Sequence, residues 1–310
     1  MSYLVITNCT GRKSQTPDPK LSTTPKLTSQ RDIGECAQTW ANIIKNAKHL
    51  YKAEFLYQGR SIVDSKAVGG MLNADAYVIS AGLGLVSSQD LIPSYEFTVV
   101  DGSPFGKQLQ KQGYSNQDWW KKLNSALKKT SNPLSKLING GRYKQVFIAL
   151  PSSYLEMIKD DLWGADPKLL SKVLVFTSSY GAQFIPEEWR HHALPYDERL
   201  EDTKSGYAGT RSDFPQRAMR HFLETVWTPK DSLEISIKKT SQNLQMLKKP
   251  TLPARRRVDD DEILRIIKKN WKNKLGNSRD LLRYIRDEAL VSCEQSRFQK
   301  LCSQVKDSKK

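Results

Sequence analysis

The feature that most constrains the fold is a regular alternation of short apolar runs with helical patterns along the first two thirds of the chain. The runs are rich in β-branched and aromatic residues and have the length of strands: Tyr3–Thr7, Ala53–Tyr57, Ala76–Ser80, Lys144–Leu150 and Lys172–Thr177. Between them, apolar residues recur at helical spacing, for example over Ile33–Lys48. Strands that alternate with helices form a largely parallel sheet covered on both faces. We therefore predict an α/β fold with three layers and a mostly parallel sheet.

The composition bounds the class of protein. The chain has 310 residues, of which 38% are hydrophobic, enough for one sizeable core and a smaller module. No apolar run reaches the length of a membrane span, and the first residues form a strand pattern rather than a signal peptide. The four cysteines form no CxxC pair and are not grouped with histidines. We therefore expect a cytoplasmic protein with reduced thiols, no membrane partner and no structural metal ion.

Motifs for nucleotide cofactors are missing from the sequence. Gly82-Leu83-Gly84 lacks the third glycine and the immediate helix of a dinucleotide-binding loop, and no GxxxxGKS/T phosphate loop is present. His191 and His192 are adjacent, so in a strand they would point to opposite faces and could not share one metal ion. We expect neither a cofactor nor a metal ion.

The charge of the chain is strongly basic and unevenly spread. The formal net charge is +16, and residues 228–310 carry 21 Lys and Arg against 11 Asp and Glu. Solubility alone needs a net charge of only about 2–8 in a small domain. The excess in the last part of the chain therefore indicates a polyanionic partner, most simply nucleic acid.

The last part of the chain divides into a linker and a helical module. We predict an α/β catalytic domain over 1–227, a basic linker over 228–258 and a small all-α basic domain over 259–310, in which three short helices resemble a helix-turn-helix on DNA. A basic module that docks onto a protein is the alternative. The arginines expected to contact DNA are Arg255, Arg256, Arg257, Arg279, Arg283 and Arg297.

The stretch from Ala76 to Thr98 is the centre of the predicted site. Its apolar strand breaks at Gly82 and Gly84, and a polar loop follows. Ligands of an open α/β sheet lie beyond the carboxyl ends of the strands, where four loops of this chain converge. A long surface loop with an ordinary turn is the alternative. The residues expected to line a substrate pocket are Gly82, Leu83, Gly84, Tyr95, Glu96, Ser178 and Asp197.

Two polar residues in these loops are the predicted catalytic pair. Asn8 follows the first strand and would hold a water molecule or a sugar, while Arg12 and Lys13 would meet phosphates. Asp90 is the acid on a neighbouring loop. An amide with a held water and a nearby carboxylate suit cleavage of an N-glycosidic bond, because its transition state resembles an oxocarbenium ion. A turn or capping role is the alternative for Asp90.

A further basic surface is expected on the helix Ser212–Val226. One side carries an apolar stripe, and the other side and the preceding residue carry Arg211, Arg217 and Arg220. Arginine near a helix start is unfavourable for the helix dipole unless an anion docks there. We expect these arginines to bind DNA phosphates, with a solvated amphipathic helix as the alternative.

Three segments carry a resemblance to a known family: the strand followed by NCTGRK, the segment SAGLGLVSSQDLIPSYE, and PYDERLED with GTRSDFPQRAMRHF. They resemble the uracil-DNA-glycosylase-like domain of archaeosine synthases, and the chain as a whole is most similar to the Brig-type anti-phage DNA glycosylases. The C-terminal LLRYIRDEALVSCEQSRF is similar to the small helical domain appended to such proteins. In the family an Asn or Asp follows the first strand, which matches Asn8, and the acidic position falls on Asp90. Ser178-Ser179-Tyr180 replaces the HPSP-like motif.

The resemblance implies a uracil-DNA-glycosylase-like fold and an anti-phage activity. The substrate would be double-stranded phage DNA with a modified cytosine, such as glucosylated hydroxymethylcytosine, and the product an abasic site. Three other functions share many of the same residues: a glycosylase or transglycosylase acting on tRNA or other RNA, a bifunctional enzyme with Lys13 as a Schiff-base nucleophile, and a DNA-binding protein without catalysis.

Overall fold

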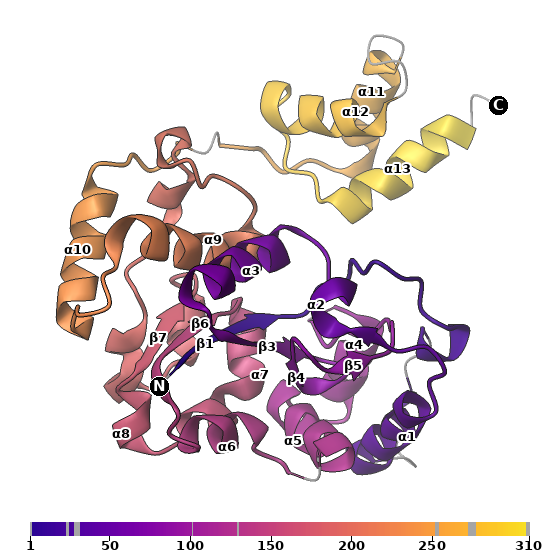
Figure 1. Ribbon diagram of the computed structural model, residues 1–310. Helices are drawn as coiled ribbons and strands as arrows, with labels where there is room; N and C mark the ends of the chain where they lie inside the picture. The colour runs from indigo at the N-terminus through magenta and orange to yellow at the C-terminus, as the bar shows by residue number, and fades with distance from the viewer. Residues whose placement is uncertain are drawn as a thin grey trace. The chain divides into compact units, whose positions relative to one another are not determined.

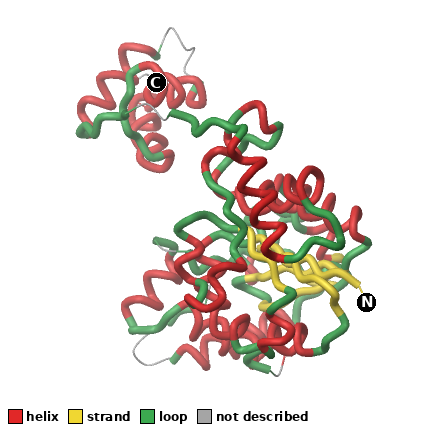
Figure 2. The backbone as a smooth tube through the Cα atoms, turned by 90° about the vertical axis from the view of Figure 1, so that its left-hand side faces the viewer, coloured by secondary structure: helices red, strands yellow, loops and turns green. Residues whose placement is uncertain are grey.

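The chain forms two compact units, Met1–Lys249 and Pro250–Lys310 (Figures 1 and 2). The computed structural model describes residues 2–22, 25–27, 32–100, 102–128, 130–251, 254–271 and 277–307. Within the predicted linker 228–258, the helix α10 (Leu233–Gln245) packs onto the first unit through the fully buried Leu244. The prediction of a linker is therefore wrong for residues 233–245, because apolar residues at helical spacing give this helix a buried face.

The first unit is built on a five-stranded sheet with the order β4-β3-β1-β6-β7. β1, β3, β6 and β7 are parallel, and β4 is antiparallel to β3. This confirms the α/β fold with a mostly parallel sheet. The strands of the sheet are β1 (Ser2–Asn8), β3 (Asp75–Ser80), β4 (Gly84–Ser87), β6 (Tyr143–Ala149) and β7 (Val173–Phe176).

Helices cover both faces of the sheet, as Figure 1 shows. Besides α10, the main helices of this unit are α1 (Ile33–Lys45), α2 (Ala53–Leu56), α3 (Arg60–Leu72), α4 (Pro104–Lys111), α5 (Asn116–Lys128), α6 (Pro133–Asn139), α7 (Ser152–Trp163), α8 (Pro167–Leu170) and α9 (Phe214–His221), which continues as a π-helix over Phe222–Val226. On one face the core joins α3, α9 and α10 to Val5 and Phe147; on the other, α1, α5 and α7 pack around Leu4 and Ile6. Alternate residues of a strand point to opposite faces, so β1 contributes to both cores.

The strand expected at Ala53–Tyr57 is wrong. The strand β2 (Tyr51–Lys52), paired with β5 (Leu91–Ile92), ends just before this run, and the helix α2 covers Ala53–Leu56. Ala53 and Leu56 are both buried, which is the i, i+3 spacing of one side of a helix. A run of five residues is too short for its apolar pattern to separate a strand from a helical turn.

A tight hairpin follows β3 at Gly84, where a loop was predicted. Gly84 has a φ of 70°, and a Cβ added there would lie 2.0 Å from Asn124 Oδ1. Only glycine fits this position, because it combines a left-handed backbone with a close approach from α5. The hairpin sends β4 back along β3, with Ser87 opposite Tyr77, so the residues after β4 lie towards the amino end of the parallel strands.

The described residues of the second unit form three helical segments around a core of their own. They are α11 (Asp260–Asn270), α12 (Ser278–Arg283), continued as a π-helix over Tyr284–Glu288, and α13 (Gln295–Asp307). The sequence offers Asp259 or Asp260 as the cap of α11 and Asn277 or Ser278 as the cap of α12. In the structure Asp259 and Asn277 accept the backbone N–H groups. The helix stop expected at Gly276 lies outside the described residues.

Candidate active site

The loop after β1 is held in place by the end of α2. Lys13 forms a backbone bridge with Tyr57, Ser14 N–H donates to the Leu56 carbonyl at 2.9 Å, and Gln58 N–H donates to the Arg12 carbonyl at 3.1 Å. These contacts join backbone atoms only, so the path of the loop does not depend on its exposed side chains. The contact fixes Lys13 at the carboxyl edge of β1 and β3.

Six side chains gather at this edge, and we call them the carboxyl-edge cluster: Cys9, Lys13, Tyr57, Ser80, Tyr95 and Tyr154. The Tyr95 hydroxyl lies 2.5 Å from Ser80 Oγ and 2.9 Å from the Tyr57 hydroxyl, while Cys9 Sγ lies 3.2 Å from the Tyr154 hydroxyl. Burial raises the pKa of all three tyrosines, so the phenols stay neutral and remain hydrogen-bond donors.

The hydrogen bonds of Ser80 set the direction of the chain of hydroxyls. Its Oγ accepts from Gly82 N–H at 3.2 Å and from Leu83 N–H at 2.9 Å. With both lone pairs used, the Ser80 proton is donated to Tyr95. A single hydrogen bond joins the Tyr95 and Tyr57 hydroxyls, and only one of their two phenolic protons can form it. The other phenolic proton has no acceptor within this chain of hydroxyls.

Lys13 lies over the buried tyrosines. Its Nζ is 4.3 Å from the centre of the Tyr95 ring and donates to the Thr10 carbonyl at 3.1 Å. Burial lowers the pKa of Lys13, and electrostatic interactions with Cys9 and Glu96 partly oppose this lowering. Glu96 is exposed, so this edge presents a partly exposed amine with a carboxylate within electrostatic reach.

Asn8 lies beside the cluster but its amide is already engaged. Asn8 Nδ2 donates to the Cys9 carbonyl at 2.8 Å, and Gln216 Nε2 donates to Asn8 Oδ1 at 2.8 Å. The side chain of Gln216 also donates to the Ala149 carbonyl at the end of β6. Asn8 therefore ties β1 to α9 and β6, with one lone pair and one N–H left for a ligand.

Asp90 does not lie at this edge. Asn8 pairs with Ile79 near the carboxyl end of β3, whereas Ser88, two residues before Asp90, donates its N–H to the Ala76 carbonyl near the amino end. The Asp90 carboxylate accepts from Ser87 N–H at 2.9 Å and lies 3.7 Å from Lys128 Nζ. The expected meeting of Asn8 and Asp90 around one sugar is wrong, because the Gly84 hairpin reverses the chain between them. Asp90 is a turn residue.

The predicted pocket residues of the Gly82–Gly84 turn are packed against protein. A Cβ on Gly82 would lie 2.7 Å from the Tyr95 ring, and Leu83 is 4% exposed. Tyr95 itself is fully buried, so its expected place in the lining of a substrate pocket is contradicted. These residues support the site from beneath and do not line it. Of the loop residues predicted to contact substrate, Glu96 is the exposed one.

The predicted residues on the later loops have other roles. Arg217 is buried between Asp213 and Glu201, both at 2.7 Å, and Arg220 pairs with Asp64 and Glu224. The expected phosphate contact of Arg217 is contradicted, since its side chain is 1% exposed and both carboxylates already hold it. The Arg220 side chain remains 35% exposed, although two carboxylates already pair with it. Asp197 pairs with Arg199 at 2.8 Å. Ser178 accepts from Gly181 N–H beyond the edge strand β7, two strands from β1. Arg12 and Arg211 are exposed, and their phosphate contacts stay a prediction.

A cavity of about 380 Å³ lies between the sheet and the helices α2 and α3. Thr7 and Tyr57 line it, so it adjoins the carboxyl-edge cluster. Gly69 and Gly70 of α3 also line it, and a Cβ on either would meet no atom within 4 Å. The cavity and the cluster therefore share the Tyr57 side chain.

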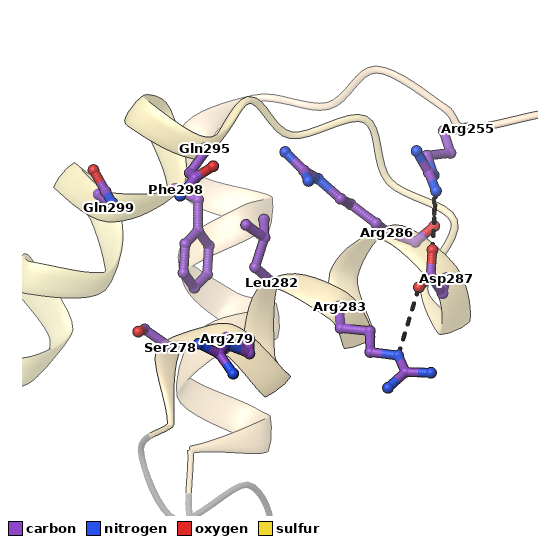
Figure 3. Close-up of a pocket in the computed structure, with 10 residues that line it drawn as sticks. All are labelled: Arg255, Ser278, Arg279, Leu282, Arg283, Arg286, Asp287, Gln295, Phe298 and Gln299. Carbon is purple, nitrogen blue, oxygen red and sulfur yellow. Dashed lines mark hydrogen bonds and ion pairs between the residues drawn. The ribbon is translucent and has the colours of Figure 1, made fainter. Parts of the chain in front are cut away.

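The second unit carries a basic groove of about 540 Å³, shown in Figure 3. We call it the arginine groove. Arg255 and Arg283 both approach Asp287, at 2.9 and 3.9 Å, while the Arg283 side chain remains 81% exposed. Of the other predicted arginines, Arg256 pairs with Glu262 and Arg297 with Asp260, and Arg257 is exposed. The groove is lined by Arg255, Ser278, Arg279, Leu282, Arg283, Arg286, Asp287, Gln295, Phe298 and Gln299.

Sequence reasoning missed Cys9, Tyr57, Ser80 and Tyr154 as members of the site. Cys9 and Ser80 stand at the ends of two predicted strands, which was a usable signal. Tyr57 follows α2 and Tyr154 lies on α7, and no local pattern brings them to that edge. Among the described residues, no group of His, Cys, Asp and Glu is suited to hold a metal ion, and no helix is long and apolar enough to cross a membrane.

Comparison of the chain with protein-family models, with curated proteins and with solved structures found no match.

The hydroxyl chain predicts unequal costs for removing its two phenols. Tyr95→Phe leaves both Ser80 and Tyr57 without their partner, whereas Tyr57→Phe removes one bond. We expect Tyr95→Phe to lower the free energy of unfolding by about 2–3 kcal/mol and Tyr57→Phe by about 1 kcal/mol. Urea denaturation followed by tryptophan fluorescence measures both. Equal losses, or a larger loss for Tyr57→Phe, would contradict the arrangement of the bonds.

Proposed function

We propose that the protein is a DNA glycosylase that hydrolyses the N-glycosidic bond of a modified base and leaves an abasic site. The observation that supports this best is the meeting of an amide loop, an amine and an exposed carboxylate at the carboxyl edge of β1 and β3. That edge is where open α/β sheets bind ligands. The substrate class, a modified cytosine in double-stranded phage DNA, rests on the sequence resemblance.

In this proposal Glu96 takes the part first given to Asp90. Glu96 is exposed and acts on Lys13 electrostatically, and Lys13 also interacts with Cys9, the neighbour of Asn8. An anion at this place would stabilise the positive charge that develops on the sugar. Asn8 would hold the water through the lone pair and N–H that its internal bonds leave over.

The arginine groove would bind the duplex. Two of its arginines lie on α12, one on the π-helix that continues it and one on the segment before α11: Arg279, Arg283, Arg286 and Arg255. Ser278, Gln295 and Gln299 add neutral donors. Arginine with neutral donors is the usual set of phosphate contacts in protein–DNA complexes. Arg12 and Arg211 are exposed residues of the first unit that would add phosphate contacts near the reacting nucleotide.

A matched pair of variants tests whether Glu96, and not Asp90, is the anion of the site. Glu96→Gln removes the anion from the carboxyl edge, so we expect base release to fall by about 10²-fold or more. Asp90→Asn removes one charge at the amino end of β3, and we expect activity within about twofold of the unmodified protein. The assay incubates each protein with duplexes containing cytosine or glucosylated hydroxymethylcytosine and measures freed bases by mass spectrometry.

Release lost in Asp90→Asn and kept in Glu96→Gln would contradict the proposed site. Release of no base from any duplex by the unmodified protein would contradict the proposed function. The same assay with modified tRNA separates the RNA-acting alternative.

Duplex binding through the arginine groove predicts a particular salt dependence. Each phosphate contact contributes about 0.9 to the slope of log K against log salt concentration. We expect Arg279→Ala and Arg283→Ala each to reduce that slope by about 1, measured by fluorescence anisotropy. Arg265→Ala is the matched control, because Arg265 is an exposed arginine on α11 that does not line the groove. An equal reduction of the slope in all three variants would mean that duplex binding depends on the net charge of the protein and not on the arginine groove.

A further inference from the structure

Lys13 differs from an ordinary surface lysine in its surroundings. Its Nζ lies 4.3 Å from the centre of the Tyr95 ring and 5.9 Å from that of Tyr57, two side chains that are almost fully buried. The backbone bridge to Tyr57 holds the lysine there. The side chain is partly exposed, so a ligand at the carboxyl edge can reach it.

Lys144 offers a contrast within the same sheet. Its Nζ lies 4.1 Å from the centre of the Tyr3 ring, nearly the same contact as that of Lys13 with Tyr95. Lys144 is exposed and stands near the start of β6, at the amino end of the parallel strands. The two lysines therefore share a cation–π contact and differ in burial and in the edge of the sheet.

We propose that Lys13 is a nucleophile that forms a Schiff base with C1′ of the abasic sugar, so that the enzyme also cleaves the DNA strand. This inference rests on the proposed function for its substrate, the abasic site. It adds an activity, since hydrolysis of the glycosidic bond by water does not require an amine.

The step uses the open-chain aldehyde of the abasic sugar. The neutral amine of Lys13 attacks C1′, the carbonyl electrons move to oxygen, and the carbinolamine loses water to give an iminium ion. Loss of a proton from C2′ then drives the C3′–O bond to break, and the 3′-phosphate leaves with the electron pair. Glu96 is the carboxylate placed to accept the C2′ proton. Water hydrolyses the imine and returns the free amine and an unsaturated aldehyde.

Burial of Lys13 favours this chemistry, because it lowers the pKa of the amine and so raises the fraction of neutral amine at a given pH. The backbone bridge to Tyr57 and the contacts with the two buried tyrosine rings supply the geometry, since they hold Nζ at the carboxyl edge.

The experiment uses the full chain with a duplex that already contains an abasic site, in the presence of borohydride. Borohydride adds hydride to C1′ of the imine and leaves a stable secondary amine, which migrates as a protein–DNA adduct in a denaturing gel. We expect an adduct with the unmodified protein and with Lys144→Arg, and at least about tenfold less with Lys13→Arg. Lys13→Arg keeps the positive charge over Tyr95 but cannot form an imine, and circular dichroism checks that it folds.

Peptide mapping of the adduct should place the modification on Lys13. An adduct on another amine, or equal adducts with Lys13→Arg and Lys144→Arg, would overturn the inference, as would no adduct with the unmodified protein. Because the abasic site is supplied, this result is separate from base release. Base release without an adduct refutes only the lyase step, whereas an adduct without base release from any duplex refutes only the glycosylase.

Discussion

The hydroxyl of Ser80 is the point on which the candidate site depends. It stands at the end of β3, accepts two N–H groups from the following turn and donates to Tyr95, fifteen residues further on. Between these residues the chain runs to the amino end of the sheet along β4 and returns. The bond therefore brings the returning segment, and Glu96 with it, back to the carboxyl edge. Without these bonds Ser80 would be a buried polar group with no partner, and the turn after β3 would lose the acceptor of its two N–H groups.

Much of the fold was predictable from sequence because the strands have strong local signals. The runs at Tyr3–Thr7, Ala76–Ser80, Lys144–Leu150 and Lys172–Thr177 all contain strands in the structure. Their apolar side chains face two cores, and such runs are typical of buried parallel strands. The short run at Ala53–Tyr57 failed, since two buried residues three apart fit a helical turn as well as a strand.

The site was predictable only in part. Asn8 and Lys13 follow directly from their place after a strand. Asp90 was predicted as the acid on the neighbouring loop and as the acidic position that the resemblance implies, but the hairpin at Gly84 reverses the chain between Ser80 and Asp90. That reversal depends on the close approach of Asn124 from α5, a contact forty residues away in sequence that no local pattern contains. Arginine shows the same limit: Arg217 and Arg283 look alike in sequence, yet one is buried between two carboxylates and the other is 81% exposed.

Hydrogen exchange on a bound duplex tests the central claim most directly. The protein is incubated with a duplex whose target nucleotide is replaced by a tetrahydrofuran abasic analogue, which lacks the aldehyde and cannot react. Backbone amides in residues 9–14 and 93–98 should then exchange more slowly than in the free protein, while those in 87–90 should exchange at the same rate. Protection of 87–90 without protection of 9–14 would place the substrate at the amino end of the sheet and contradict the account.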